Sequence, residues 1–175
     1  MMKETKKITL SAMLTALGVV IMLLGAVIEA LDLSVGAIAS LIVVFVFIEI
    51  GKPYHFLVWI CTSLILALVY PGSAMWIEYL LIFGIYPIMK AYIEKLPKWS
   101  WWPVKIAYIN SVVAFLALGM EKILGIPFFE EEGQGMMIFF WILLNVAFVM
   151  YDIFLRTLIR VYMLKYRERF SKLLK

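Results

Sequence analysis

Long apolar runs without a charged residue constrain this chain more than any other feature of its sequence. The first run, from Ile8 to Ile28, has about 21 residues, enough for a helix to cross the hydrocarbon core of a bilayer. Similar runs recur along the chain, and 65% of its 175 residues are hydrophobic. A water-soluble fold of this size would leave much of that apolar surface exposed. The sequence therefore predicts an all-α membrane protein with a single integral membrane domain, residues 1–175.

Six transmembrane helices are predicted from these runs and from the residues that separate them. Gly51-Lys52-Pro53 and Pro71-Gly72-Ser73 are strong stops, because proline cannot continue a helical hydrogen-bond ladder. The fourth segment is the weakest, since its uncharged part between Glu78 and Lys90 is short and spans only if both side chains reach the interfaces. The predicted helices cover residues 8–30, 33–50, 54–70, 75–93, 103–126 and 135–160, and a basic tail follows at 161–175.

The positions of the basic residues predict the orientation of these helices. With both termini in the cytoplasm, fifteen of the 16 Lys and Arg residues lie on the inner side, and Lys122 is the exception. Lys and Arg in short loops are retained in the cytoplasm, whereas acidic residues have little influence. A five-helix chain without the weak fourth segment would place the basic tail outside. We therefore expect six helices, both ends inside, and a multi-pass protein of the cell (plasma) membrane.

The composition argues against an enzyme. His55 is the single histidine and Cys61 the single cysteine, so no histidine–cysteine metal site is expected. The sequence has no Gly-rich phosphate loop, and its short loops leave no room for a soluble catalytic domain. The cations gather at helix ends, as in membrane orientation, which argues against a nucleic-acid partner. We expect no catalytic residue, no metal and no cofactor.

The first helix carries small residues at helical spacing, with Ala12 and Ala16 on one face. Small residues let two membrane helices approach closely, so this face suits either internal packing or a partner helix. A chain of this size with six helices, both ends inside, and Ala12-Met13-Leu14-Thr15-Ala16 near the start of the first helix resembles the substrate-binding S component of energy-coupling-factor (ECF) vitamin transporters. It also resembles uncharacterised integral membrane proteins of the same topology.

The resemblance to S components implies a partner and a cargo. It implies that Ala12 and Ala16 dock on a transmembrane coupling subunit that is driven by ATPases. It also implies a pocket for a small vitamin-like substrate in the outer half, beneath the loop that joins the first two helices.

Polar and aromatic residues in the predicted outer half are candidates for such a pocket. Trp76, Tyr79, Phe83 and Tyr86 recur at three- and four-residue spacing, which indicates an aromatic stripe on the fourth helix. An aromatic belt or helix packing is the alternative interpretation. The predicted substrate-binding residues are Glu29, Trp76, Glu78, Tyr79, Glu121, Trp141 and Asn145.

Two further features are predicted to be structural. Asn110 suits a hydrogen bond between helices, and Asn145, near mid-membrane, must find a partner in the protein or in a ligand. Asp152 and Arg156 are four residues apart, so they can neutralise one another on one helix face, or contact a partner subunit.

Three functions remain open at this stage. The first is a substrate-capture subunit of a vitamin-type uptake transporter, which works with a coupling subunit and its ATPases in the lipid bilayer. The second is a small structural membrane subunit of a cell-envelope assembly complex with no ligand. The third, an independent ion-coupled carrier, is disfavoured because the sequence has no internal repeat.

Overall fold

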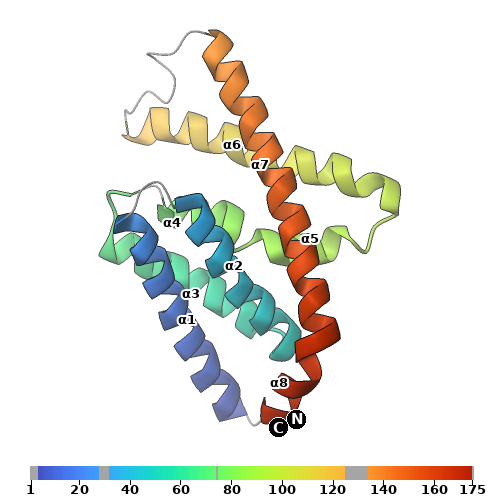
Figure 1. The fold of residues 1–175 in the computed structure, drawn as a ribbon. Helices are drawn as coiled ribbons and strands as arrows, with labels where there is room; N and C mark the ends of the chain where they lie inside the picture. Colours follow the sequence, from blue (N-terminus) through green and yellow to red (C-terminus); the bar gives the residue numbers. More distant parts are fainter. Residues whose placement is uncertain (1–3, 28–31, 74, 125–133, 175) are drawn as a thin grey trace. The chain divides into compact units, whose positions relative to one another are not determined.

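In the computed structural model, residues 4–27, 32–73, 75–124 and 134–174 are described, and they are helical almost throughout (Figure 1). No β-strand occurs within these ranges, and their helices form six segments, which confirms the predicted all-α class. The segments are α1 (Glu4–Val27); α2 (Asp32–Glu49); α3 (Tyr54–Val69); α4 (Met75–Glu78) with η2 (Tyr79–Phe83) and α5 (Tyr86–Ile93); η3 (Lys98–Ser100) with α6 (Trp101–Leu124); and α7 (Gln134–Val161) with η4 (Tyr162–Tyr166) and α8 (Arg167–Leu174).

Three helical stretches of the described chain are long and apolar enough to cross a membrane. They are Glu4–Ala26, Met75–Ile93 and Ile138–Phe170, and two shorter apolar helices, Leu33–Glu49 and Tyr54–Val69, accompany them. The weak fourth segment of the sequence is among the three. These helices indicate a membrane protein.

Contacts within the chain divide it into two compact units. Unit 1 comprises Met1–Ala91 and Leu155–Lys175, and unit 2 comprises Tyr92–Phe154. The long helix α7 therefore contributes its first part to unit 2 and its last turns to unit 1. Each unit has its own polar and apolar contacts, which are described separately.

Unit 1 is built on α1, α2 and α3, whose apolar faces meet in a common core. Buried side chains of α2, α3 and the turn between them form this core, and residues of α1 pack against it; they are Ile42, Val46, Ile50, Tyr54 and Val58, with Leu10, Leu14 and Ile21. At Gly18, a Cβ atom would lie in ordinary van der Waals contact, 3.5 Å from Ile42 and from the hydroxyl of Thr62, so α1 lies directly against α2 and α3 there. Small residues allow such close packing of membrane helices.

The turn between α2 and α3 forms where the sequence predicts a stop. The backbone N–H groups of Ile50 and Gly51 both donate to the carbonyl oxygen of Val46, at 3.0 and 2.9 Å. Gly51 has φ +86°, a left-handed conformation that glycine adopts without steric cost at a helix C-terminus. Pro53 then precedes the first residue of α3.

A π-helix, η2, interrupts the fourth segment. The N–H of Gly84 donates to the carbonyl oxygen of Tyr79 at 2.7 Å, and the indole N–H of Trp59 on α3 donates to the carbonyl oxygen of Leu80 at 2.9 Å. Two glycines make room for this arrangement: a Cβ atom on Gly36 would collide with the Phe83 ring, and one on Gly84 with the Trp59 ring. The π-helix thus packs closely against α2 at Gly36 and is held to α3 by the Trp59 indole.

The aromatic residues predicted as a stripe on this segment are largely core residues. Tyr79 and Tyr86 are fully buried and Phe83 is 6% exposed, whereas Trp76 is half-buried. The regular three- and four-residue spacing assumed a continuous α-helix, and η2 changes that register. Tyr79, Phe83 and Tyr86 therefore contribute packing to unit 1, as the alternative interpretation of the stripe expects.

Candidate functional site

A cluster of amide and indole groups joins α6 and α7 in unit 2. The side-chain amide of Asn110 on α6 donates to Asn145 Oδ1 on α7 at 3.1 Å, and Asn145 Nδ2 returns a bond to Asn110 Oδ1 at 3.2 Å. The indole N–H of Trp141, one turn before Asn145, also donates to Asn110 Oδ1. The predicted role of Asn110 as a hydrogen bond between helices is confirmed, and Asn145 is its partner.

The amide cluster, Asn110, Trp141 and Asn145, has nearly all its side-chain donors and acceptors paired. Asn110 uses both amide hydrogens, the second toward the carbonyl oxygen of Ile106 at 2.8 Å, and its oxygen accepts two bonds. Asn145 also uses both hydrogens, the second toward the carbonyl oxygen of Trp141 at 2.9 Å. Its oxygen accepts one described bond, although an amide oxygen has two lone pairs. The cluster therefore retains one acceptor position, on Asn145 Oδ1.

A cavity of about 490 Å³, widely open at the surface of unit 2, lies against this cluster, and its lining residues Ile142 and Met150 are exposed. None of the described residues that line it is charged, and apolar side chains predominate; the lining is Asn110, Trp141, Ile142, Asn145, Val146, Val149 and Met150. Small-molecule sites typically combine an apolar wall with a few placed polar groups in a volume of roughly 300–1,000 Å³. The geometry suits an uncharged, largely apolar molecule with one N–H or O–H group.

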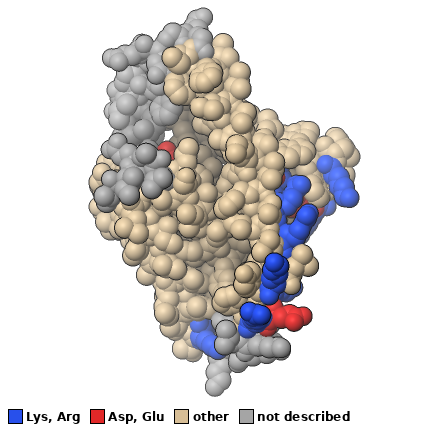
Figure 2. Space-filling model, in the orientation of Figure 1, with Lys and Arg blue, Asp and Glu red and all other residues tan. Residues whose placement is uncertain are grey.

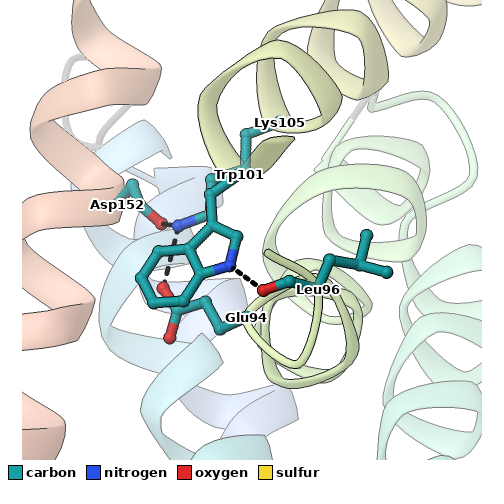
Figure 3. A network of polar contacts seen from close by, with 5 residues as sticks. All are labelled: Glu94, Leu96, Trp101, Lys105 and Asp152. Atoms are coloured by element: carbon teal, nitrogen blue, oxygen red, sulfur yellow. Dashed lines mark hydrogen bonds and ion pairs between the residues drawn. The ribbon is translucent and has the colours of Figure 1, made fainter. Parts of the chain in front are cut away.

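A second polar cluster, of charged groups, joins the same two helices to the segment that precedes them. The ammonium group of Lys105 on α6 lies 2.8 Å from Asp152 Oδ1 on α7 and 2.9 Å from Glu94 Oε1, in the loop before η3 (Figure 3). Lys105 and Asp152 are fully buried, and the Glu94 side chain is 28% exposed. A buried ammonium group needs such carboxylates, because removal from water costs several kcal/mol per ion in proteins.

Indole rings shield this charged cluster. The Lys105 ammonium group lies 6.0 Å from the ring centroid of Trp101 and 5.5 Å from that of Trp102, within cation–π range. The Trp101 N–H donates to the carbonyl oxygen of Leu96 at 2.7 Å, which fixes the loop that carries Glu94 (Figure 3). The charged cluster, Glu94, Lys105 and Asp152, therefore ties three successive segments of unit 2 together.

The sequence singled out Asp152 and suggested Arg156 as its partner; the partnership with Lys105, and the role of Glu94, were missed. A signal was present in the sequence. Asn110 lies five residues after Lys105, and its partner Asn145 lies seven residues before Asp152. The later residue on α6 pairs with the earlier residue on α7, so the two contacts run in opposite order along the two helices.

The remaining predicted substrate residues lie elsewhere. Trp76, Glu78 and Tyr79 belong to α4 and η2 of unit 1, where Trp76 borders a cavity of about 10 Å³, too small for a ligand. Tyr79 is buried, and its hydroxyl group has no hydrogen-bond partner among the described residues. Glu29 lies outside the described residues, and the side chain of Glu121 on α6 is outside them too. The structure thus brings Trp141 and Asn145 together, and Tyr79 does not line their cavity.

The small residues of α1 divide between two faces of that helix. Ser11, Thr15 and Gly18 are buried against the rest of unit 1, whereas Ala12 and Ala16 are exposed. The predicted docking pair therefore lies on the face of α1 that the described residues leave exposed.

No metal centre is apparent in the described ranges. Within them, no group of three or more His, Cys, Asp and Glu side chains is placed to hold a metal ion. His55 is fully buried between aromatic rings, 4.8 Å from the Phe47 centroid and 4.3 Å from that of Phe56. Its Nδ1 atom lies 3.1 Å from the carbonyl oxygen of Gly51, a contact that fixes the ring in the helix start.

Comparison with known proteins gives no match: no family model, no curated protein and no solved structure is similar to this chain.

We predict strong coupling between Lys105 and Asp152. Lys105→Met should lower the free energy of unfolding by about 3–5 kcal/mol, because it leaves buried carboxylates without their ammonium partner. The double variant Lys105→Met/Asp152→Asn should recover part of that loss. Thermal unfolding in detergent micelles, analysed as a double-mutant cycle, measures the coupling.

Lys95→Met is the matched control, because Lys95 is exposed and its ammonium group lies over the Tyr92 ring, 4.8 Å from the centroid. That variant should change stability by less than about 0.5 kcal/mol. Additive losses from Lys105→Met and Asp152→Asn would contradict the coupling.

Proposed function

We propose that this chain is a substrate-capture subunit of a vitamin-type uptake transporter. It takes a small molecule from the outer side of the cell membrane and docks on a transmembrane coupling subunit driven by ATPases. The observation that supports the proposal best is the cavity of unit 2, with its apolar wall and the free acceptor position on Asn145 Oδ1. The ligand has an apolar body and at least one N–H or O–H group, because a charged ligand would find no counter-ion among the lining residues.

The topology that goes with this function has six membrane-spanning helices and both termini in the cytoplasm. The support is the distribution of Lys and Arg, because the positive-inside rule favours this orientation. In this orientation the fourth segment, Met75–Ile93, crosses the membrane through its π-helix.

Cysteine labelling tests the topology. In a Cys61→Ala background, Ser34→Cys should react with a membrane-impermeant maleimide in intact cells, since Ser34 is exposed near the predicted outer end of α2. Lys98→Cys, at the exposed start of η3, should react after permeabilisation alone. Reaction of Lys98→Cys in intact cells would refute the orientation.

Ligand retention tests the cavity. Met150→Trp should reduce the amount of co-purified small molecule about tenfold, because the indole ring fills the cavity while the amide cluster stays intact. Asn145→Leu should also reduce retention by up to about tenfold, the equivalent of one lost hydrogen bond. Mass spectrometry of molecules released from the purified protein measures both effects.

The matched control for ligand retention is Met13→Trp, a change at an exposed methionine of α1 that does not line the cavity. Equal retention by Met13→Trp and Met150→Trp would contradict ligand binding at this site. A purified wild-type protein that retains no small molecule would favour the structural alternative.

Docking rests on the exposed alanine pair of α1. Ala16→Trp should abolish co-purification with the coupling subunit, because the indole ring prevents close approach of a partner helix. Thermal unfolding should stay unchanged, since Ala16 is exposed on α1. Ala147→Trp, at an exposed alanine of α7, is the control and should leave co-purification intact. Loss of folding in Ala16→Trp would show that this face packs internally.

A structural membrane subunit of a cell-envelope assembly complex is the second candidate. It is favoured by the mutual hydrogen bonds of the amide cluster, in which Asn110 already uses all its donors and both lone pairs. In that role α6 and α7 present an interaction surface, and the cavity receives no substrate.

A further inference from the structure

The C-terminal part of the chain is held on unit 1 by an aromatic contact with α2. The ring centroid of Phe45 on α2 lies 5.9 Å from that of Tyr162 and 5.8 Å from that of Phe170, and both contacts are edge-to-face. Tyr162 and Phe170 are themselves 6.1 Å apart. Edge-to-face aromatic pairs add stability beyond the area they bury. We call Phe45, Tyr162 and Phe170 the tail anchor.

The last turn of α2 adds a polar contact to the tail anchor. The hydroxyl of Tyr162 donates to Glu49 Oε1 at 3.0 Å, and Arg167 Nε lies 4.0 Å from the same oxygen. The Glu49 side chain is 7% exposed, whereas the Arg167 side chain is 50% exposed. Glu49 is thus largely covered, and the charge of Arg167 still faces outward.

The last turn of α7, η4 and α8 expose both cations and apolar side chains. Arg160, Lys165, Arg167 and Arg169 are all exposed, and Figure 2 shows basic side chains over the C-terminal part of α7 and over α8. Leu164 is 79% exposed beside them, and Tyr166 is 46% exposed. Exposed leucine and tyrosine side chains would contribute nothing to the binding of a free phosphate ion in water. An interfacial segment needs both kinds of group, because its apolar side chains enter the acyl boundary while its cations meet head groups.

We propose that the last turn of α7, η4 and α8 form a binding surface for anionic phospholipid head groups. Arg160, Lys165, Arg167 and Arg169 contact the lipid phosphates, and Leu164 and Tyr166 insert at the acyl boundary. The tail anchor and Glu49 hold this surface in place, so binding depends on the fold of unit 1 as well as on charge. This inference is independent of the substrate-capture proposal, since it requires a bilayer alone.

Titration of the purified full-length chain with phosphatidylglycerol and with phosphatidylcholine, followed by native mass spectrometry, tests the proposal. The wild type should bind phosphatidylglycerol at least tenfold more tightly than phosphatidylcholine. Arg160→Gln/Arg169→Gln should reduce the affinity for phosphatidylglycerol about tenfold, since a cation near an anionic surface contributes up to about fivefold. The matched control Lys95→Gln/Lys98→Gln removes two exposed cations of unit 2 and should keep the preference.

A second pair of variants separates a built surface from net charge. Phe170→Ala keeps every charge but removes one ring of the tail anchor, and it should lower the affinity for phosphatidylglycerol at least threefold. Phe139→Ala, at an exposed phenylalanine of α7, should have no effect. Equal losses of phosphatidylglycerol affinity in Arg160→Gln/Arg169→Gln and in Lys95→Gln/Lys98→Gln would overturn the proposal. Wild-type affinity in Phe170→Ala would overturn it too. Displacement of the lipid by millimolar glycerol phosphate would assign the cations to a free phosphate and would also overturn it.

Discussion

The ammonium group of Lys105 has no access to water, and its position between Asp152 and Glu94 determines how unit 2 is assembled. In apolar surroundings, each charge or amide that leaves water needs a partner of matching geometry, because an unpaired one costs several kcal/mol. Unit 2 meets this requirement at two depths, with the charged cluster nearer the start of α6 and the amide cluster further along it. Apolar side chains alone specify a membrane helix pair weakly, since lipid tails are as apolar as leucine. The polar pairs select which turns of α6 and α7 meet.

The sequence predicted the helical class and most helix ends, because these depend on local signals. Long uncharged runs set the helices, and Gly51 with Pro53 set the turn between α2 and α3. Partners far apart in sequence were harder to predict. For Asp152 the sequence suggested Arg156, four residues away on its own helix, and did not reveal Lys105, 47 residues away. Helical spacing reveals neighbours on one helix face but carries no information on which faces meet.

In the candidate site, too, some residues were predicted from the sequence and others were not. Trp141 and Asn145 were predicted from residue type and depth, and the structure places them together beside a cavity. Tyr79 satisfied the same criteria, yet it is a core residue of unit 1. A tyrosine in an apolar run serves packing or binding equally well, and composition does not distinguish the two. An asparagine near mid-membrane is more informative, because its amide requires a partner wherever it lies.

The π-helix between α4 and α5 holds one residue more than the α-helical ladder needs over the same length. The wider turn of η2 takes up this residue, closed by the bond from the Gly84 N–H to the Tyr79 carbonyl oxygen. The consequence is rotational. Each residue of an α-helix turns the chain by about 100°, so the same sequence wound as a continuous α-helix would turn α5 by that angle relative to α4. Tyr86 and Ile88, now buried, would leave the core of unit 1, and other faces of α5 would replace them. The extra residue thus sets the angular phase between the two halves of the fourth segment, a quantity that no single side chain controls.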